Sequence, residues 1–291
     1  MRRRLGRGGA RAVAASPSLE LAIDQLLHSP YVHDVRVGQS LAEAQRSVSA
    51  TALWHIRVLA GWLPRRGAEV VRTLAGAWEI ANLSLVLASM RGATPVTAYE
   101  LGDLATISRR YLSASSPTDL RRLLAVSAWG DPYTEEPAEL LGWMRLRWGE
   151  RVALLVPGAS DWAAGYLALE IARALFVDGR RPGRRGWPVS PLGTGWEKAS
   201  SIPDLARRLA PRARSTLAGV EDGTGLWSAE ARWLSAVERM ALERQDRIRP
   251  GSAEEVVASA VVLGADAWRT RAALEVASRG GQPLEAFDAL G

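Results

Sequence analysis

The chain has 291 residues, a hydrophobic fraction of 47% and a formal net charge of +6, values that describe a basic globular protein. A chain of this length buries about three quarters of its unfolded surface, so we expect a large core. It contains no cysteine, which excludes disulfides, thiolate metal sites and a cysteine nucleophile. No apolar run reaches about 18 residues, and the basic opening lacks the apolar stretch of a signal peptide. We therefore expect a cytoplasmic protein.

The positive charge raises nucleic acid as a partner, because the isoelectric point is near 10.4. Lys198 is the only lysine, so nearly every cation is an arginine, a skew that GC-rich coding produces by itself. The arginines are also spread along the whole chain, whereas a nucleic-acid footprint gathers on one element. A basic nucleic-acid-binding protein is therefore kept as an alternative.

Helical periodicity covers most of the chain, with apolar residues recurring every three or four positions. Ser40 with Glu43 and Ser252 with Glu255 form capping boxes, which mark helix starts. In chain order, we expect helices over residues 18–28, 40–63, 65–92, 99–112, 118–128, 135–156, 161–177, 203–216, 228–247 and 252–280. No segment alternates as a strand does, so the predicted fold class is all-α.

The helix expected at residues 65–92 is the one around which the first part of the chain is organised. Its apolar face widens between Leu83 and Met90, and Asn82 interrupts it just before that point. A buried amide with an unmet donor or acceptor costs about 1–3 kcal/mol. We therefore expect Asn82 to bond to the backbone of a neighbouring segment.

The order of elements repeats along the chain. Three helix pairs end with an acidic residue close to a tryptophan and a further apolar run. The residues are Trp78 and Glu79, Asp161 and Trp162, and Asp266 and Trp268. This recurrence predicts three pseudo-repeated helical units at residues 1–94, 95–178 and 202–291, with residues 179–201 as an irregular linker.

Three stretches carry a resemblance to a known family, the C/d family of V-type ATPase central-stalk proteins. The segment WEIANLSLVLASMRG, residues 78–92, resembles the aspartate-x-x-asparagine-leucine helix of that family. Residues 26–48 are similar to its leucine-rich opening with a Thr/Ser-x-Tyr step. Residues 248–290 resemble its terminal acidic-x-x-x-leucine-arginine helix and the glycine-x-proline turn that follows.

The resemblance implies a fold and a function. The fold is three helical pseudo-repeats arranged as a funnel. The function is that of a non-catalytic rotor component of the central stalk, which couples the rotating shaft to the membrane proteolipid ring during ion transport. The implied location is cytoplasmic and peripherally membrane-associated, with no cofactor and no small-molecule substrate.

The match is that of a divergent member. Glu79 and Asn82 fit the first motif, but its arginine falls on Ala88. The second repeat offers Asp161 without an asparagine, and the third offers Asp266 and Arg271. The alternative from the residues alone is a helical-repeat adaptor or scaffold unrelated to ATPases.

Sequence patterns typical of catalysis do not occur. His28, His33 and His55 lack a spacing that suggests a metal site, and no Gly-x-Ser-x-Gly elbow presents a serine nucleophile. The Gly193-Thr194-Gly195 stretch lacks the lysine that a phosphate-binding loop needs. We expect no enzyme activity and no cofactor.

The expected linker holds the densest basic cluster of the chain. Its arginines lie beside two tryptophans outside any expected helix. The residues are Arg180, Arg181, Arg184, Arg185, Trp187 and Trp196. One interpretation is contact with an acidic partner or the membrane surface, and the other is a solvated linker.

Overall fold

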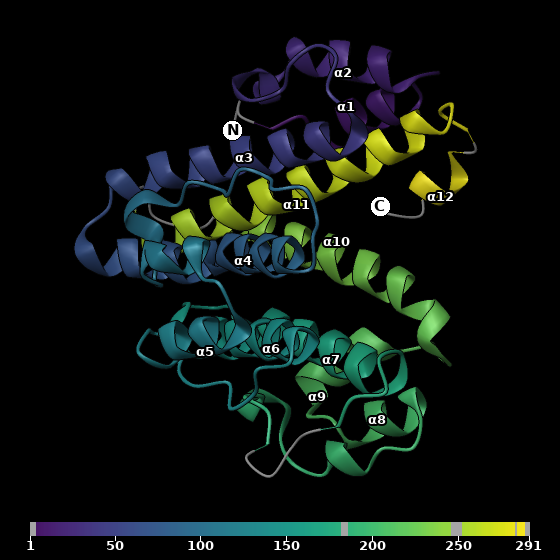
Figure 1. Cartoon of the computed structure of the whole chain (residues 1–291). Coiled ribbons are helices and arrows are strands. Elements are labelled where there is room, and N and C mark those ends of the chain that lie inside the picture. The colour runs from purple at the N-terminus through teal and green to yellow at the C-terminus, as the bar shows by residue number, and fades with distance from the viewer. Residues whose placement is uncertain (1–3, 182–185, 246–251, 283, 289–291) are drawn as a thin grey trace. The chain divides into compact units, whose positions relative to one another are not determined.

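The structure, a computed structural model, describes residues 4–181, 186–245, 252–282 and 284–288 (Figure 1). Within these ranges the regular secondary structure is all helical, which confirms the predicted all-α class. The chain forms two compact units, residues 1–62 with 234–291 and residues 63–233. These units cut across the repeats expected from the sequence, because each unit joins segments from neighbouring repeats.

Unit 1 is built around α11. This helix packs along α1 and α3, which come from the other end of the chain (Figure 1). The helices of this unit are α1 (Gly6–Ala14), α2 (Leu19–Leu27), α3 (Leu41–Gly61), α11 (Ala253–Ser278) and α12 (Glu285–Asp288), with a 3₁₀ turn at Pro30–His33. Helix α10 (Leu226–Gln245) begins in unit 2 and ends in unit 1.

Unit 2 is built around α6, which packs against both α4 and α7. Its helices are α4 (Arg65–Met90), α5 (Pro117–Ala125), α6 (Pro137–Leu155), α7 (Ser160–Phe176), α8 (Ile202–Arg208) and α9 (Pro211–Arg214). Short 3₁₀ turns lie at Gly102–Leu104, Arg109–Ser113, Ser190–Leu192, Trp196–Lys198, Ser215–Leu217 and Gly223–Gly225. A large apolar core gathers α7 with residues 189–220, including Leu192, Trp196 and Leu205.

Two expected helices differ in the structure. Residues 99–112 hold only two 3₁₀ turns, because side chains of α4 bond the backbone of Tyr99, Thr106 and Ile107 and hold it outside a helical ladder. The helix expected at 203–216 is divided into α8 and α9. Pro211 lacks the N–H that a continuous helix would use, so the second helix starts there.

One local arrangement recurs three times. The short helices α2, α5 and α8 each begin after a serine whose side chain accepts a bond from the backbone N–H three residues later. The serines are Ser18, Ser116 and Ser201. Buried apolar residues follow at the fourth and eighth positions, namely Ala22 and Leu26, Leu120 and Leu124, and Leu205 and Leu209. Each short helix precedes two long ones, α3 and α4, α6 and α7, or α10 and α11.

Two pairs of long helices approach each other through a tryptophan and a glycine. Trp148 Nε1 of α6 donates to the Thr73 carbonyl of α4 at 2.9 Å, and Gly76 lies three residues on. A β-carbon at Gly76 would lie 2.8 Å from Trp148 Cδ1, so only glycine admits the ring.

The second pair has the same geometry. Trp233 Nε1 of α10 donates to the Trp162 carbonyl of α7 at 2.9 Å, and Gly165 lies three residues on. This match sets the register between α4 and α7. The positions of Glu79 and Asn82 correspond to Ala168 and Ile171.

Gly165→Ala tests this close approach. The new β-carbon would lie 2.8 Å from Trp233 Cδ1 and 2.6 Å from Thr216 Oγ1. We expect the free energy of unfolding to fall by roughly 1–3 kcal/mol, because the indole must move out of a packed site. Gly264→Ala in α11 is the matched control, since nothing lies within 4 Å of its β-carbon and alanine favours the helix by about 0.5–1 kcal/mol. Guanidinium denaturation measures both, and equal effects at the two glycines would contradict the packing described.

Candidate functional site

The sequence-predicted Glu79 is a buried carboxylate in the middle of α4. Its side chain has no exposed surface. It accepts hydrogen bonds from the backbone N–H and the hydroxyl of Thr106, from Ile107 N at 3.0 Å and from Trp129 Nε1 at 2.8 Å. A buried carboxylate is stable only where its oxygens find donors, and here they find several. Glu79 therefore holds the segment before α5, and the turn after it, against α4.

Asn82 lies one turn further along the same helix face. It is fully buried, its Nδ2 donates to the Tyr99 carbonyl at 2.9 Å, and its Oδ1 accepts from Tyr99 N at 2.6 Å. The expectation that Asn82 bonds to neighbouring backbone is confirmed. The neighbour is an extended segment and not another helix.

Asp266 has the same environment in unit 1. It is fully buried in α11 and accepts from Leu5 N at 2.9 Å, Gly6 N at 2.8 Å and the Tyr31 hydroxyl at 2.8 Å. Gly6 begins α1, so the carboxylate faces the positive end of that helix. Asp266 thus fastens the start of the chain and the turn after α2 to one long helix.

The aromatic donors of the two sites follow matching turns. Ser29 Oγ donates to the Leu26 carbonyl at 2.7 Å and accepts from Tyr31 N at 3.1 Å. Ser127 Oγ donates to the Leu124 carbonyl at 2.7 Å and accepts from Trp129 N at 3.1 Å. The serine-x-aromatic step therefore has one structure in both units. We call each set, Glu79 with Thr106, Ile107 and Trp129, and Asp266 with Leu5, Gly6 and Tyr31, an acid clamp.

Arg269 is a buried polar position that the sequence motifs did not single out. It lies three residues after Asp266, as Asn82 lies three residues after Glu79. Its side chain is 3% exposed and bonds Glu238 of α10 at 2.7 Å. The equal spacing was the signal in the sequence, but an arginine in place of an asparagine concealed it.

The other predicted motif residues do not join an acid clamp. Asp161 is exposed at the start of α7, and the register set by the tryptophans pairs Glu79 with Ala168 instead. Trp162 is buried and packs beside Trp233. Trp78 and Trp268 are half-buried, and Arg271 is exposed with its carbonyl accepting from Gln45 Nε2.

The two linker tryptophans stack on each other, with ring centroids 5.7 Å apart and planes 11° from parallel. Trp196 is 3% exposed and belongs to the core of unit 2, so its ring is not a surface for a partner. Trp187 is half-buried. Arg180 pairs with Asp178 at 2.5 Å, and Arg181 is exposed. Arg184 and Arg185 lie outside the described residues.

Two further properties bear on function. Among the described residues, no group of three His, Asp or Glu side chains is arranged to hold a metal ion. By length and composition alone, Gly67–Met90 of α4 could cross a membrane, but 61% of its apolar window is buried. A buried core helix meets the same criteria, so this is weak support for a membrane span.

No protein-family profile matches the chain, and no curated protein matches it significantly.

The acid clamps can be tested by removing charge at constant shape. Glu79→Gln and Asp266→Asn each replace an acceptor oxygen by an N–H₂ group that faces donors, so we expect unfolding free energies lower by roughly 2–4 kcal/mol. Asp161→Asn makes the same change at an exposed site and should stay within about 0.5 kcal/mol. Denaturation midpoints at unchanged slope measure the three variants. A loss at Asp161 as large as at Asp266 would refute the distinction.

Tyr111, near the acid clamp of Glu79, makes stability depend on alkaline pH. Burial raises the pKa of Tyr111 to about 12, and the Glu79 carboxylate adds to the rise. In the unfolded chain tyrosine loses its proton near pH 10. The stabilisation is thus complete below pH 10 and is lost as the pH rises to about 12, by roughly 1–3 kcal/mol. Tyr111→Phe should reduce the decline in unfolding free energy between pH 10 and 12. Identical pH profiles for the two proteins would contradict this.

Proposed function

We propose that this chain is a non-catalytic rotor component of the central stalk of a V-type ATPase. It would join the rotating shaft to the membrane proteolipid ring, with both partners contacted from the cytoplasmic side. One observation supports this above the others. The residues that carry the family resemblance, Tyr31, Glu79, Asn82 and Asp266, are those that make the buried polar contacts of the acid clamps and of the neighbouring amide.

The clamps suit a part that transmits torque. A rotor has to keep its shape under load, so its segments need fixed positions more than they need reactive groups. Hydrogen bonds from backbone N–H groups to a buried carboxylate are charge-assisted and directional, which fixes a segment in one position. The long helices α4 and α11, each of 26 residues, provide the elements to which those segments are fixed.

The adaptor alternative shares these features, because any helical scaffold gains from them. The nucleic-acid alternative is less well supported. Several arginines are already paired with carboxylates, for example Arg121 with Asp131 and Arg173 with Glu230. Paired arginines have less free charge to offer to phosphates.

Co-purification from membranes tests the proposal. The chain is tagged in its own cell, membranes are solubilised in mild detergent, and the tagged complex is isolated. We expect it to contain an ATP-hydrolysing head, shaft proteins and a small proteolipid that reacts with a carbodiimide. Gly264→Ala is the control that should retain the complex, whereas Asp266→Asn should reduce its recovery.

The other outcomes are informative. Isolation of the chain without any ATPase component, from membranes that contain the ATPase, would reject the rotor role and favour an adaptor. Salt-sensitive retention on DNA would favour the nucleic-acid alternative.

A further inference from the structure

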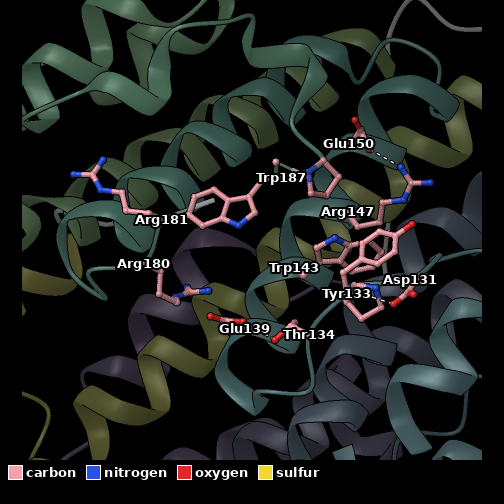
Figure 2. A pocket seen from close by; sticks show the side chains of 13 residues that line it. Asp131, Tyr133, Thr134, Glu139, Trp143, Arg147, Glu150, Arg180, Arg181 and Trp187 are labelled. Atoms are coloured by element: carbon pink, nitrogen blue, oxygen red, sulfur yellow. Dashed lines mark hydrogen bonds and ion pairs between the residues drawn. The ribbon is translucent and has the colours of Figure 1, made fainter. Parts of the chain in front are cut away.

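Unit 2 contains a cavity of about 600 Å³ that the rotor role does not use (Figure 2). It lies between the first half of α6, the turn at residues 131–134 and the connection after α7. Its volume is within the range of small-molecule sites, about 300–1,000 Å³.

Three aromatic rings line this cavity. In the view of Figure 2, Arg181 lies on one side of Trp187, and the rings of Trp143 and Tyr133 lie on the other. Trp143 and Trp187 are half-buried, and the indole N–H of each has no hydrogen-bond partner among the described residues. The cavity thus offers flat apolar faces together with two unused donors.

Tyr133 is held in an unusual backbone conformation. Its φ is 57°, the only positive φ at a non-glycine residue in the described chain. Asp131 Oδ1 accepts from Tyr133 N at 2.8 Å and fixes the turn. Such conformations gather at binding sites, where the surrounding structure imposes them.

Most of the charges at the cavity are paired. Asp131 accepts from Arg121 Nε at 2.9 Å, and Glu150 accepts from Arg147 Nη1 at 2.6 Å. Arg180 is paired with Asp178 at 2.5 Å. These groups carry no net charge that a ligand has to match.

Two charges in the cavity lining are left over. The Glu139 carboxylate accepts only from the Thr134 hydroxyl, at 2.5 Å, and has no cation within 4 Å among the described residues. The Arg181 guanidinium reaches only the carbonyls of Glu197 and Ala199, at 3.5 and 3.4 Å. The cavity therefore presents one open negative group and one open positive group, with aromatic faces available between them.

We propose that this cavity binds a small zwitterion. Its ammonium group pairs with Glu139 and lies against an aromatic face, where a cation is attracted by the ring. Its phosphate or carboxylate group pairs with Arg181, whose planar fork fits either anion. A ligand with only one of these charges leaves the other protein group unpaired, so the cavity selects for both. The binding is independent of the rotor role.

Phosphocholine is the probe that tests this, with choline and inorganic phosphate as its two halves. We expect calorimetry on the full chain to show phosphocholine binding at least about tenfold tighter than either half, since a charge-assisted contact is lost with each. Arg181→Gln should weaken phosphocholine about tenfold and leave choline unchanged. Glu139→Gln should weaken phosphocholine and choline and leave phosphate unchanged.

Matched surface variants control for nonspecific charge. Arg212→Gln and Glu221→Gln make the same changes at exposed positions of unit 2 outside the cavity lining, and both should bind phosphocholine as the wild type does. Trp187→Phe removes one donor and part of one face, and it should weaken binding without unfolding the chain.

Vesicles distinguish a lipid headgroup from a free small molecule. Cosedimentation with phosphatidylcholine vesicles that is lost in Arg181→Gln and Glu139→Gln would assign a lipid, and binding of soluble phosphocholine alone would assign a free ligand. The proposal is overturned if no probe binds at millimolar concentration. It is also overturned if phosphate binds as tightly as phosphocholine and Glu139→Gln changes neither.

Discussion

A buried carboxylate that needs hydrogen-bond donors determines much of this structure. An ionised acid inside a helical core is costly unless its oxygens are occupied, and a helix offers none of its own backbone N–H groups for this. Glu79 and Asp266 therefore recruit donors from segments outside any helical ladder. Those segments must pass close to the acid, which sets the path of residues 99–107 and of the chain before α1.

The sequence predicted the elements that depend on local patterns. Most expected helices formed, and the burial of Asn82 followed from its place in an apolar run. Residues 99–112 were expected to be helical from their periodicity, but partners on α4 decided their structure. Local propensity carries no information about such distant partners.

The candidate sites show the same limit. Asp161 stands beside a tryptophan as Glu79 does, yet it lies at an exposed helix start, well before Ala168, the residue that matches Glu79 in register. Only the bond from Trp233 to the Trp162 carbonyl sets that register. The cavity beside α6 was likewise beyond prediction, because it unites residues 131–150 with residues 180–188. Trp196, expected at the surface, is in the core because Trp187 covers it.

The middle repeat lacks an acid clamp, and this has a thermal consequence. Where the other two long helices hold the following or preceding segment by polar contacts, α7 presents Ala168 and Ile171 to a core that contains Leu192 and Trp196. Apolar burial loses strength on cooling, whereas a hydrogen bond to a carboxylate does not share that dependence. The segment after α7 is therefore the part of unit 2 whose attachment weakens first in the cold. A single fold thus contains joints with opposite responses to temperature.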